Sequence, residues 1–230
     1  MVTSDAVRAY SQRAAEYADA LGRIEHAVPD DREFVRSWAG TVVGPIIDVG
    51  CGPGQWTDFL RTHGAEIEGL DPVAAFIESA QSHYPSSRYR VGRAQGLEVK
   101  DGSLGGILAW YSLIHVDPSS IDESFAEFAR ALKPGGSLLL GFFDGESGEP
   151  FEHAVVTAYF WSPQTLAERL KLHGFNVVKT VRREAQGARP HAAIVAVKTR
   201  ETYSSARSVS TCCESLTPAY RQGLVTVWEG

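Results

Sequence analysis

The sequence predicts a doubly wound α/β fold with seven strands, mostly parallel and ending in an antiparallel C-terminal hairpin. Apolar runs rich in β-branched residues alternate with helical patterns between residues 42 and 174, which is typical of strand–helix units around a parallel sheet. Two further strand patterns, at 175–181 and 192–197, have no helix between them and therefore indicate an antiparallel pair. Five strand–helix alternations with right-handed crossovers would place helices on both faces of the sheet.

The parallel strands are expected where short apolar runs are bounded by turn residues. These runs lie at 42–49, 66–70, 88–91, 106–110 and 137–143. The last one, SLLLGFF, follows KPGG, which predicts a turn before a buried strand.

Capping residues mark the starts of the helices. Asp71 is expected to cap a helix that has Pro72 in its first position. Ser120 and Glu123 form a capping-box pattern ahead of the next helix, and Ser162 is expected to cap the last one.

Residues 1–40 are predicted to form a helical lid ahead of the main domain, residues 41–198. Apolar residues in TSDAVRAYSQRAAEYADAL recur every three or four positions, which indicates one amphipathic helix, and a second helix is expected at 32–38. Tyr10 and Tyr17 lie seven positions apart and project from one face. Contact with a ligand and ordinary core packing are both open for them.

The last segment, 199–230, is rich in Ser and Thr, which predicts a flexible tail, with docking on this chain or on a partner as the alternative. Cys212 and Cys213 are adjacent but have no further ligands nearby, so we predict no metal.

Composition and charge restrict the class of protein. The chain has 230 residues, of which 43% are hydrophobic and 22% charged, as in a soluble globular domain. Its net charge of −6, without a basic run, argues against nucleic acid as a partner. No apolar stretch could cross a membrane or serve as an export signal, so we expect a cytoplasmic protein that acts on a small molecule. The sequence leaves a homodimer open.

A glycine-rich turn follows the first predicted strand in IIDVGCGPGQW. Such a turn brings bare backbone against a ligand, and both a dinucleotide and a sulfonium nucleoside use one. The dinucleotide fingerprint requires a third glycine at position 55, where this chain has Gln55. The pattern present instead is Asp48, Gly50, Gly52 and Gly54, which favours the sulfonium ligand.

IIDVGCGPGQW resembles motif I of the class I S-adenosylmethionine-dependent methyltransferases. Supporting pieces follow in order: Asp71, and then YRVGRAQGLE, GGILAWYSLIHVDP and ALKPGGSLLLGFF. The resemblance covers roughly residues 5–198 and is strongest to small stand-alone bacterial enzymes related to those of quinone biosynthesis. It implies a Rossmann-like methyltransferase fold, S-adenosylmethionine as cofactor and S-adenosylhomocysteine as product.

The resemblance also implies which residues bind the cofactor. Asp48 would orient the glycine turn, and Asp71 would accept hydrogen bonds from the ribose, with N-capping as its alternative role. Many relatives carry an Asp at the position of Arg93, and Arg93 cannot accept a hydrogen bond, so adenine recognition would pass to neighbouring groups. The full set is Tyr10, Tyr17, Asp48, Gly50, Cys51, Gly52, Gly54, Gln55, Trp56, Asp71, Pro72, Arg93, Ala94, Gln95, Trp110 and Tyr111.

The acceptor of the methyl group is expected after the fourth and fifth strands. His115 and His153 are the candidate catalytic bases, because histidine titrates near neutral pH. Candidate substrate-binding residues are Tyr159, Trp161, Arg189 and His191. The remaining histidines, including His26, are expected at the surface of helices.

The predicted function is transfer of a methyl group from S-adenosylmethionine to an oxygen, nitrogen or carbon of a small molecule. Motifs of nucleobase-methylating enzymes are missing from the segment after the fourth strand. Three alternatives remain: an aminopropyltransferase on the same fold, a nicotinamide dehydrogenase, and a catalytically silent cofactor-binding or regulatory protein.

Overall fold

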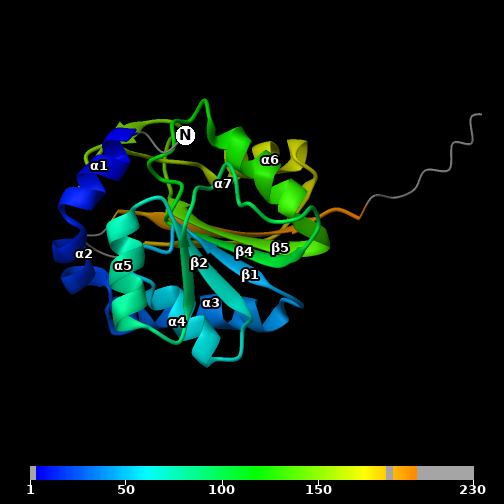
Figure 1. The fold of residues 1–230 in the computed structure, drawn as a ribbon. Helices are drawn as coiled ribbons and strands as arrows, with labels where there is room; N and C mark the ends of the chain where they lie inside the picture. Colours follow the sequence, from blue (N-terminus) through cyan, green and yellow to red (C-terminus); the bar gives the residue numbers. More distant parts are fainter. Residues whose placement is uncertain (1–3, 185–188, 201–230) are drawn as a thin grey trace, which may run out of the picture.

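A computed structural model describes residues 4–184 and 189–200 of the chain. Its centre is a seven-stranded sheet in the order β3-β2-β1-β4-β5-β9-β8 (Figure 1). The strands are β1 (Ile46–Val49), β2 (Ile67–Asp71), β3 (Arg88–Val91), β4 (Leu104–Trp110), β5 (Leu132–Phe143), β8 (Phe175–Arg183) and β9 (His191–Lys198). The helices are α1 (Ser4–Gln12), α2 (Ala14–Leu21), η1 (Ile24–His26), α3 (Pro29–Thr41), α4 (Gln55–Thr62), α5 (Ala74–His83), α6 (Ile121–Ala131) and α7 (Pro163–Leu172).

The pairing of the strands confirms the predicted fold class. Strands β3, β2, β1, β4 and β5 are parallel, whereas β9 runs antiparallel to both β5 and β8. The strand order reverses between β1 and β4, because β2 lies on one side of β1 and β4 lies on the other. In open α/β sheets, ligands bind at the carboxyl ends of the strands next to such a reversal.

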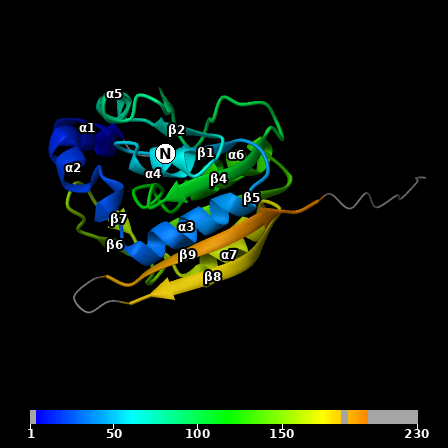
Figure 2. The same ribbon diagram turned by 90° about the horizontal axis from the view of Figure 1, so that it is seen from below.

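Two layers of helices cover the sheet (Figures 1 and 2). Helices α3 and α4 bury Val35, Trp38 and Leu60 against one face. Helix α5 packs beside them over β2 and β3. On the opposite face, α6 and α7 bury the apolar side chains Phe125, Phe128, Leu166 and Leu170. Burial on both faces explains why the central strands are almost entirely apolar.

The N-terminal segment forms two helices instead of the single helix that was predicted. The interruption is at Arg13, whose backbone leaves the helical conformation and whose side chain forms an ion pair with Glu16. Tyr10 and Tyr17 pack against Phe76 of α5, with ring centroids 5.8 and 5.4 Å away. Helices α1 and α2 therefore lie beside α5, near the ends of β1 and β2 (Figure 1).

One predicted helix cap, Asp71, was wrong, and one predicted capping box does not form although Ser120 is the N-cap of α6. Val73, not Asp71, is the N-cap of α5, because both carboxylate oxygens of Asp71 are used elsewhere in the turn. Ser120 precedes α6 but its side chain makes no capping hydrogen bond, so the capping box does not form. Ser162 does cap α7, since its hydroxyl accepts from the Thr165 backbone N–H.

Several strand boundaries also differ from the predictions. The first strand begins at Ile46 instead of residue 42, because α3 continues to Thr41 and Gly44 turns the chain. KPGG lies inside β5, whose first residue pairs with Leu104. No helix forms between β3 and β4 in this described part of the chain, so four strand–helix units replace the expected five. A short pair, β6 (Pro150–Phe151) and β7 (Ala158–Tyr159), was not predicted.

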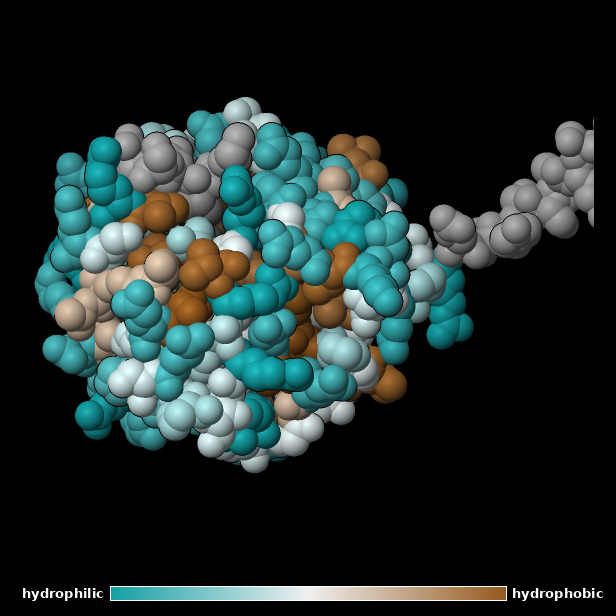
Figure 3. Space-filling model, viewed as in Figure 1, coloured by the Kyte–Doolittle hydropathy of each residue, from teal (hydrophilic) through white to brown (hydrophobic). Residues whose placement is uncertain are grey.

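The surface is mixed in character. On the face shown in Figure 3, apolar side chains form separate groups among hydrophilic ones. The most exposed large apolar residues are scattered over different elements: Val28, Val43, Val91, Leu172 and Val178. No helix among the described residues is long and apolar enough to span a membrane. The predicted tail lies almost entirely outside the described residues, as do Cys212 and Cys213.

Candidate active site

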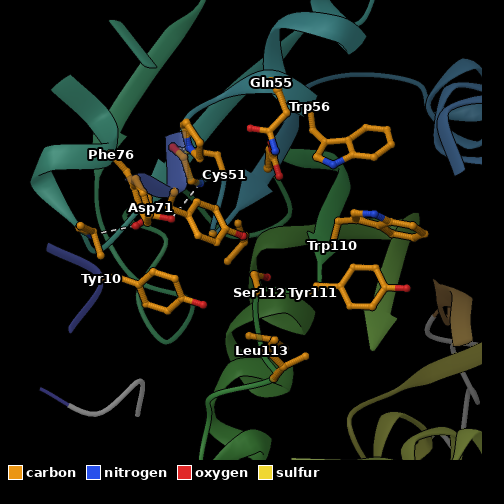
Figure 4. Close-up of a pocket in the computed structure, with 18 of the residues that line it drawn as sticks. Tyr10, Cys51, Gln55, Trp56, Asp71, Phe76, Trp110, Tyr111, Ser112 and Leu113 are labelled. Atoms are coloured by element: carbon orange, nitrogen blue, oxygen red, sulfur yellow. Dashed lines mark hydrogen bonds between the residues drawn. The ribbon is translucent and has the colours of Figure 1, made fainter. Parts of the chain in front are cut away.

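A cavity of about 420 Å³ lies at the reversal point of the sheet. The turns after β1, β2 and β4 form its floor, and α1 and α2 contribute Val7, Tyr10 and Tyr17. In Figure 4, Tyr10, Asp71 and Phe76 lie on one side, and Trp110 and Tyr111 lie on the other. We call the first side the donor end and the second the acceptor end, after the methyl donor and the methyl acceptor that the sequence predicts. The acceptor end also includes Phe143, His153 and His191.

The glycine turn after β1 presents bare backbone to the cavity. Gly50 has φ +71°, and a Cβ there would collide with Ser112. Gly52 has φ +54°, and no atom lies within 4 Å of the place where its Cβ would stand. Gly52 lines the cavity, so that free space is part of the cavity. A side chain at Gly52 would fill some of it.

Two buried carboxylates lie at the donor end. Asp71 is fixed by the glycine turn itself, because its carboxylate accepts from the backbone N–H groups of Gly52, at 2.9 Å, and Val73, at 2.8 Å. Asp48 accepts from the Thr57 hydroxyl at 2.7 Å. Burial raises the pKa of Asp48 to about 7 and that of Asp71 to about 6, although these hydrogen bonds oppose the shift.

Neither of these carboxylates forms an ion pair with another described residue. Three further cavity residues have a buried polar atom without a partner within the described chain: Oε1 of Gln55, Oγ of Ser112 and Nδ1 of His153. Gln55 is the first residue of α4, and its side chain extends into the middle of the cavity (Figure 4). Buried polar groups are normally satisfied, so these atoms are suited to a polar ligand. The donor end fits a ligand that is positively charged and donates hydrogen bonds.

Tyr10 and His115 connect the N-terminal helices to the segment after β4. The Tyr10 hydroxyl lies 2.8 Å from Nε2 of His115, and Nδ1 of His115 lies 2.8 Å from the Thr157 carbonyl oxygen. A carbonyl only accepts, so Nδ1 carries the proton and Nε2 accepts from Tyr10. Burial lowers the pKa of His115, which agrees with a neutral ring.

Aromatic rings form the acceptor end. Tyr111 has φ +57°, an unusual conformation for a residue with a side chain and one that occurs often at functional sites. Its ring centroid lies 5.4 Å from that of Phe143 and 5.9 Å from that of His191. His153 lies 6.1 Å from Phe143 and 5.1 Å from His115, again between ring centroids.

The cavity brings together most of the residues predicted from the sequence. Those that line it are Tyr10, Tyr17, Asp48, Gly50, Cys51, Gly52, Gln55, Trp56, Asp71, Pro72, Ala94, Trp110, Tyr111, His115, His153 and His191. These residues come from turns that meet because neighbouring parallel strands end at the same edge of the sheet.

Six predicted residues do not line the cavity. Gly54 packs against Tyr89 below the turn. Arg93 is exposed, and Gln95 donates instead to Ser124 of α6. On the acceptor side the residues outside the cavity are Tyr159, the buried Trp161, and Arg189, whose guanidinium lies over Phe151.

Other cavity residues were not predicted. Ser112, Phe76 and Phe143 are examples, and His26 lines the cavity although we expected it at a helix surface. Ser112 could have been predicted from its position in the sequence, since it directly follows Trp110 and Tyr111, which were predicted. His26 had none, because its position depends on how the N-terminal helices pack. Among the described residues, no group of three His, Cys, Asp or Glu side chains is placed to hold a metal ion.

Comparison with known proteins identifies the domain that carries this cavity. Residues 46–136 match the methyltransferase domain family. This part of the chain resembles the methyltransferase domain family. It contains β1, the glycine turn, both donor-end carboxylates and the aromatic residues after β4, all of which surround the cavity.

Curated relatives of the methyltransferase domain include two O-methyltransferases. The chain is 25% identical over 138 residues to malonyl-[acyl-carrier protein] O-methyltransferase of Pseudescherichia vulneris, covering 60% of this chain and 53% of that protein. It is 31% identical over 150 residues to ubiquinone biosynthesis O-methyltransferase of Xanthomonas oryzae pv. oryzae, covering 62% and 61%. The chain thus spans about half the length of the first of these relatives.

Solved structures resemble the methyltransferase domain in fold. One is 1,6-didemethyltoxoflavin-N1-methyltransferase of Burkholderia thailandensis, with 1,6-didemethyltoxoflavin and S-adenosylhomocysteine bound. Its TM-score is 0.66 at 18% identity, over 86% of this chain and 92% of that one. At this identity the likeness concerns the fold.

Proposed function

We propose that this chain transfers a methyl group from S-adenosylmethionine to a small-molecule acceptor by direct displacement. The observation that carries the proposal is the pair of buried carboxylates, Asp48 and Asp71, beside a glycine turn that leaves room for a ligand. The match of residues 46–136 to the methyltransferase domain family supports the same conclusion.

Charge distinguishes this cofactor from a dinucleotide. S-adenosylmethionine carries an ammonium and a sulfonium, which buried carboxylates attract, whereas a dinucleotide brings a pyrophosphate that they repel. The domain also lacks the sixth-position glycine of the dinucleotide fingerprint, since Gln55 stands there. We therefore reject the nicotinamide dehydrogenase.

Each part of the donor end has a proposed role. Asp71 would hold the ribose hydroxyls with its remaining lone pairs, while Gly52 and Val73 keep its carboxylate in place. Asp48 and Gln55 would hold the ammonium end. Backbone groups at Ala94 would read the adenine, since the side chains of Arg93 and Gln95 lie elsewhere.

The bound cofactor supplies an electrophilic methyl group whose carbon–sulfur bond breaks with both electrons left on sulfur. The chain contributes alignment and the exclusion of water. Tyr10 and Tyr17 would cover the donor end, so residues 1–40 act as a lid in this proposal. His115, His153 and Tyr111 border the space for the acceptor. A cytoplasmic location and the possibility of a homodimer remain predictions from the sequence.

Calorimetry tests the proposal directly. S-adenosylhomocysteine should bind tightly, whereas NAD and decarboxylated S-adenosylmethionine should bind weakly or not at all. Asp71→Ala should lower the affinity for S-adenosylhomocysteine by about tenfold or more, because it removes hydrogen bonds made by a charged group. Absence of S-adenosylhomocysteine binding would falsify the proposal.

Two alternatives remain distinguishable from methyl transfer. An aminopropyltransferase needs acidic residues to hold a polyamine, but the segment after β4 begins with Tyr111, Ser112 and Leu113. A silent cofactor-binding protein would bind S-adenosylhomocysteine without turnover. Incubation with a metabolite extract and labelled methyl donor separates the cases, since only a methyltransferase transfers label to an extracted compound.

A further inference from the structure

His115 and His153, two neighbouring histidines that line the cavity, have different hydrogen-bonding states. Both ring nitrogens of His115 are occupied, one by Tyr10 and the other by the Thr157 carbonyl. Nδ1 of His153 is enclosed by the protein and has no hydrogen-bond partner among the described residues. Only His153 therefore has a buried ring nitrogen left for a ligand.

The ring of His153 is neutral at physiological pH. Its pKa is lowered to about 4, first by burial and then by the nearby His115 and Arg189. A neutral imidazole has one nitrogen that accepts a hydrogen bond. The geometry agrees, because His153 lines the cavity between His115 and Phe143.

The neighbours of His153 suit a flat ligand. Tyr111 and Phe143 lie 5.4 Å apart at an interplanar angle of 56°, and His191 lies 5.9 Å from Tyr111. Trp110 continues this wall, 5.3 Å from Tyr111 and nearly perpendicular to it. Aromatic walls of this kind bind aromatic ligands through stacked and edge-to-face contacts.

Charge at the acceptor end argues against a cationic acceptor. Asp31 lines this region of the cavity, but it forms an ion pair with Arg183 of β8. The guanidinium of Arg189 lies over the ring of Phe151, and Phe151 in turn contacts the ring of His153. Among the described residues, the acceptor end therefore offers no unpaired carboxylate to hold a protonated amine, whereas a hydroxyl group needs none.

We propose that the methyl acceptor is a planar aromatic compound bearing a hydroxyl group, and that His153 accepts the hydrogen bond of that hydroxyl. This inference rests on the proposed function and adds the class of acceptor to it. The oxygen–methyl bond forms as the carbon–sulfur bond breaks with both electrons left on sulfur, and the hydroxyl proton passes to the imidazole of His153 as the oxygen gains positive charge and the proton becomes strongly acidic. His115 is a positioning residue in this arrangement, because it holds Tyr10 and the Thr157 segment in place.

Three probes separate the features of the acceptor. 2-Naphthol has the aromatic ring and the hydroxyl, decahydro-2-naphthol has the hydroxyl without aromaticity, and 2-(aminomethyl)naphthalene replaces the hydroxyl with a cation. Their binding to protein saturated with S-adenosylhomocysteine is measured by calorimetry. 2-Naphthol should bind at least about tenfold more tightly than either of the others. Only 2-naphthol can both pack against the aromatic rings and donate a hydroxyl hydrogen bond to His153.

Variants of His153 test its role separately. His153→Leu should weaken 2-naphthol binding by about tenfold, and His153→Asn, which keeps an acceptor atom near the same position, should recover part of the loss. S-adenosylhomocysteine affinity should stay within about twofold in both variants, since neither residue change removes a hydrogen bond made within the protein. His83→Leu, at the exposed end of α5, is the control and should change neither affinity.

Mass spectrometry of 2-naphthol incubated with the methyl donor should show the methyl ether. If S-adenosylhomocysteine binds but the three probes bind alike, or His153→Leu leaves 2-naphthol affinity unchanged, the inference is wrong while the proposed function stands. If S-adenosylhomocysteine itself does not bind, the proposed function fails first.

Discussion

The Tyr10 hydroxyl donates to Nε2 of His115 across 2.8 Å and so joins helix α1 to the segment after β4, 105 positions away in the sequence. Tyr10 also packs edge-on against Tyr17, at 5.6 Å between centroids. Through this bond the N-terminal helices are held over the donor end of the cavity. Its contribution can be measured, because the phenylalanine variant keeps the ring and removes only the hydroxyl.

Tyr10→Phe should lower the affinity for S-adenosylhomocysteine by roughly threefold to tenfold, which corresponds to one hydrogen bond. The variant leaves Nε2 of His115 without its partner, so the lid is held less firmly. Ser103→Ala is a control, since it also removes a hydroxyl hydrogen bond, to the Lys100 carbonyl, but lies outside both the cavity and the lid. Calorimetry should show a change for Tyr10→Phe alone. Equal affinities in wild type and Tyr10→Phe would contradict this role.

Cofactor affinity should rise with pH. Burial raises the pKa of Asp48 to about 7 and that of Asp71 to about 6, and a bound cation lowers both values. Binding therefore releases protons, and affinity for S-adenosylmethionine should rise by about tenfold or more between pH 5.5 and pH 8. The rise should be smaller for S-adenosylhomocysteine, which lacks the sulfonium. Calorimetry in buffers of different ionisation enthalpy counts the protons released. A pH-independent affinity would show that these carboxylates do not meet the cation.

The stability of the ligand-free protein should respond to pH in the opposite sense. Asp48 has an ordinary pKa of 3.8, and its folded value is about 7, so the folded state holds the proton more tightly than the unfolded state. Stability is greatest below pH 4 as far as this group is concerned, and it falls as pH rises to about 7, by roughly 2–4 kcal/mol.

Asp48→Asn removes this titration and keeps an oxygen for the Thr57 hydroxyl. Denaturant unfolding at pH 4, 6 and 8 should therefore show that the free energy of unfolding of the variant increases relative to that of the wild type as pH rises. The variant should also bind S-adenosylmethionine more weakly than the wild type. Parallel stability curves for the two proteins would contradict the raised pKa.

A methyl group on Gly52 should block the cofactor without disrupting the fold. Gly52 and Gly64 both have positive φ, +54° and +90°, and neither has an atom within 4 Å of the place for a Cβ. Alanine at either position should cost about 1–2 kcal/mol of stability through backbone strain. Only Gly52→Ala should lose S-adenosylhomocysteine affinity, by about tenfold or more, because only Gly52 faces the cavity. The prediction fails if calorimetry finds the same affinity for the two variants.

The donor end was largely predictable from the sequence. Asp48 lies near the end of β1, the glycine turn follows it, and Asp71 is the last residue of β2. These two strands are parallel neighbours, and such strands end at the same edge of a sheet. Local patterns therefore placed these groups together. The sequence predicts Asp71 as a helix cap, whereas in the structure its carboxylate holds the backbone of Gly52 and Val73. This role was not predictable, because it depends on which backbone N–H groups the folded turn presents.

The acceptor end was predictable only as a set of candidates. Trp161 and Tyr159 were expected to wall the pocket, but Trp161 is buried in the apolar core and Tyr159 lies in β7, where it pairs with β6. The segment between β5 and α7 has no sequence periodicity that fixes which side chains face inwards. His26 was missed because its position depends on how the N-terminal helices pack, whereas Ser112 directly follows two predicted residues.

The sequence by itself determined the fold, the strand–turn–helix unit at Gly50–Gly54 and the region where a ligand binds, because hydrophobic period and glycine spacing are local properties of the chain. Only the tertiary structure decided that both ring nitrogens of His115 are occupied, by Tyr10 and Thr157, while Nδ1 of His153 has no partner among the described residues. These partners come from segments far apart in the sequence, and their contacts exist only once the helices and loops have packed around the sheet.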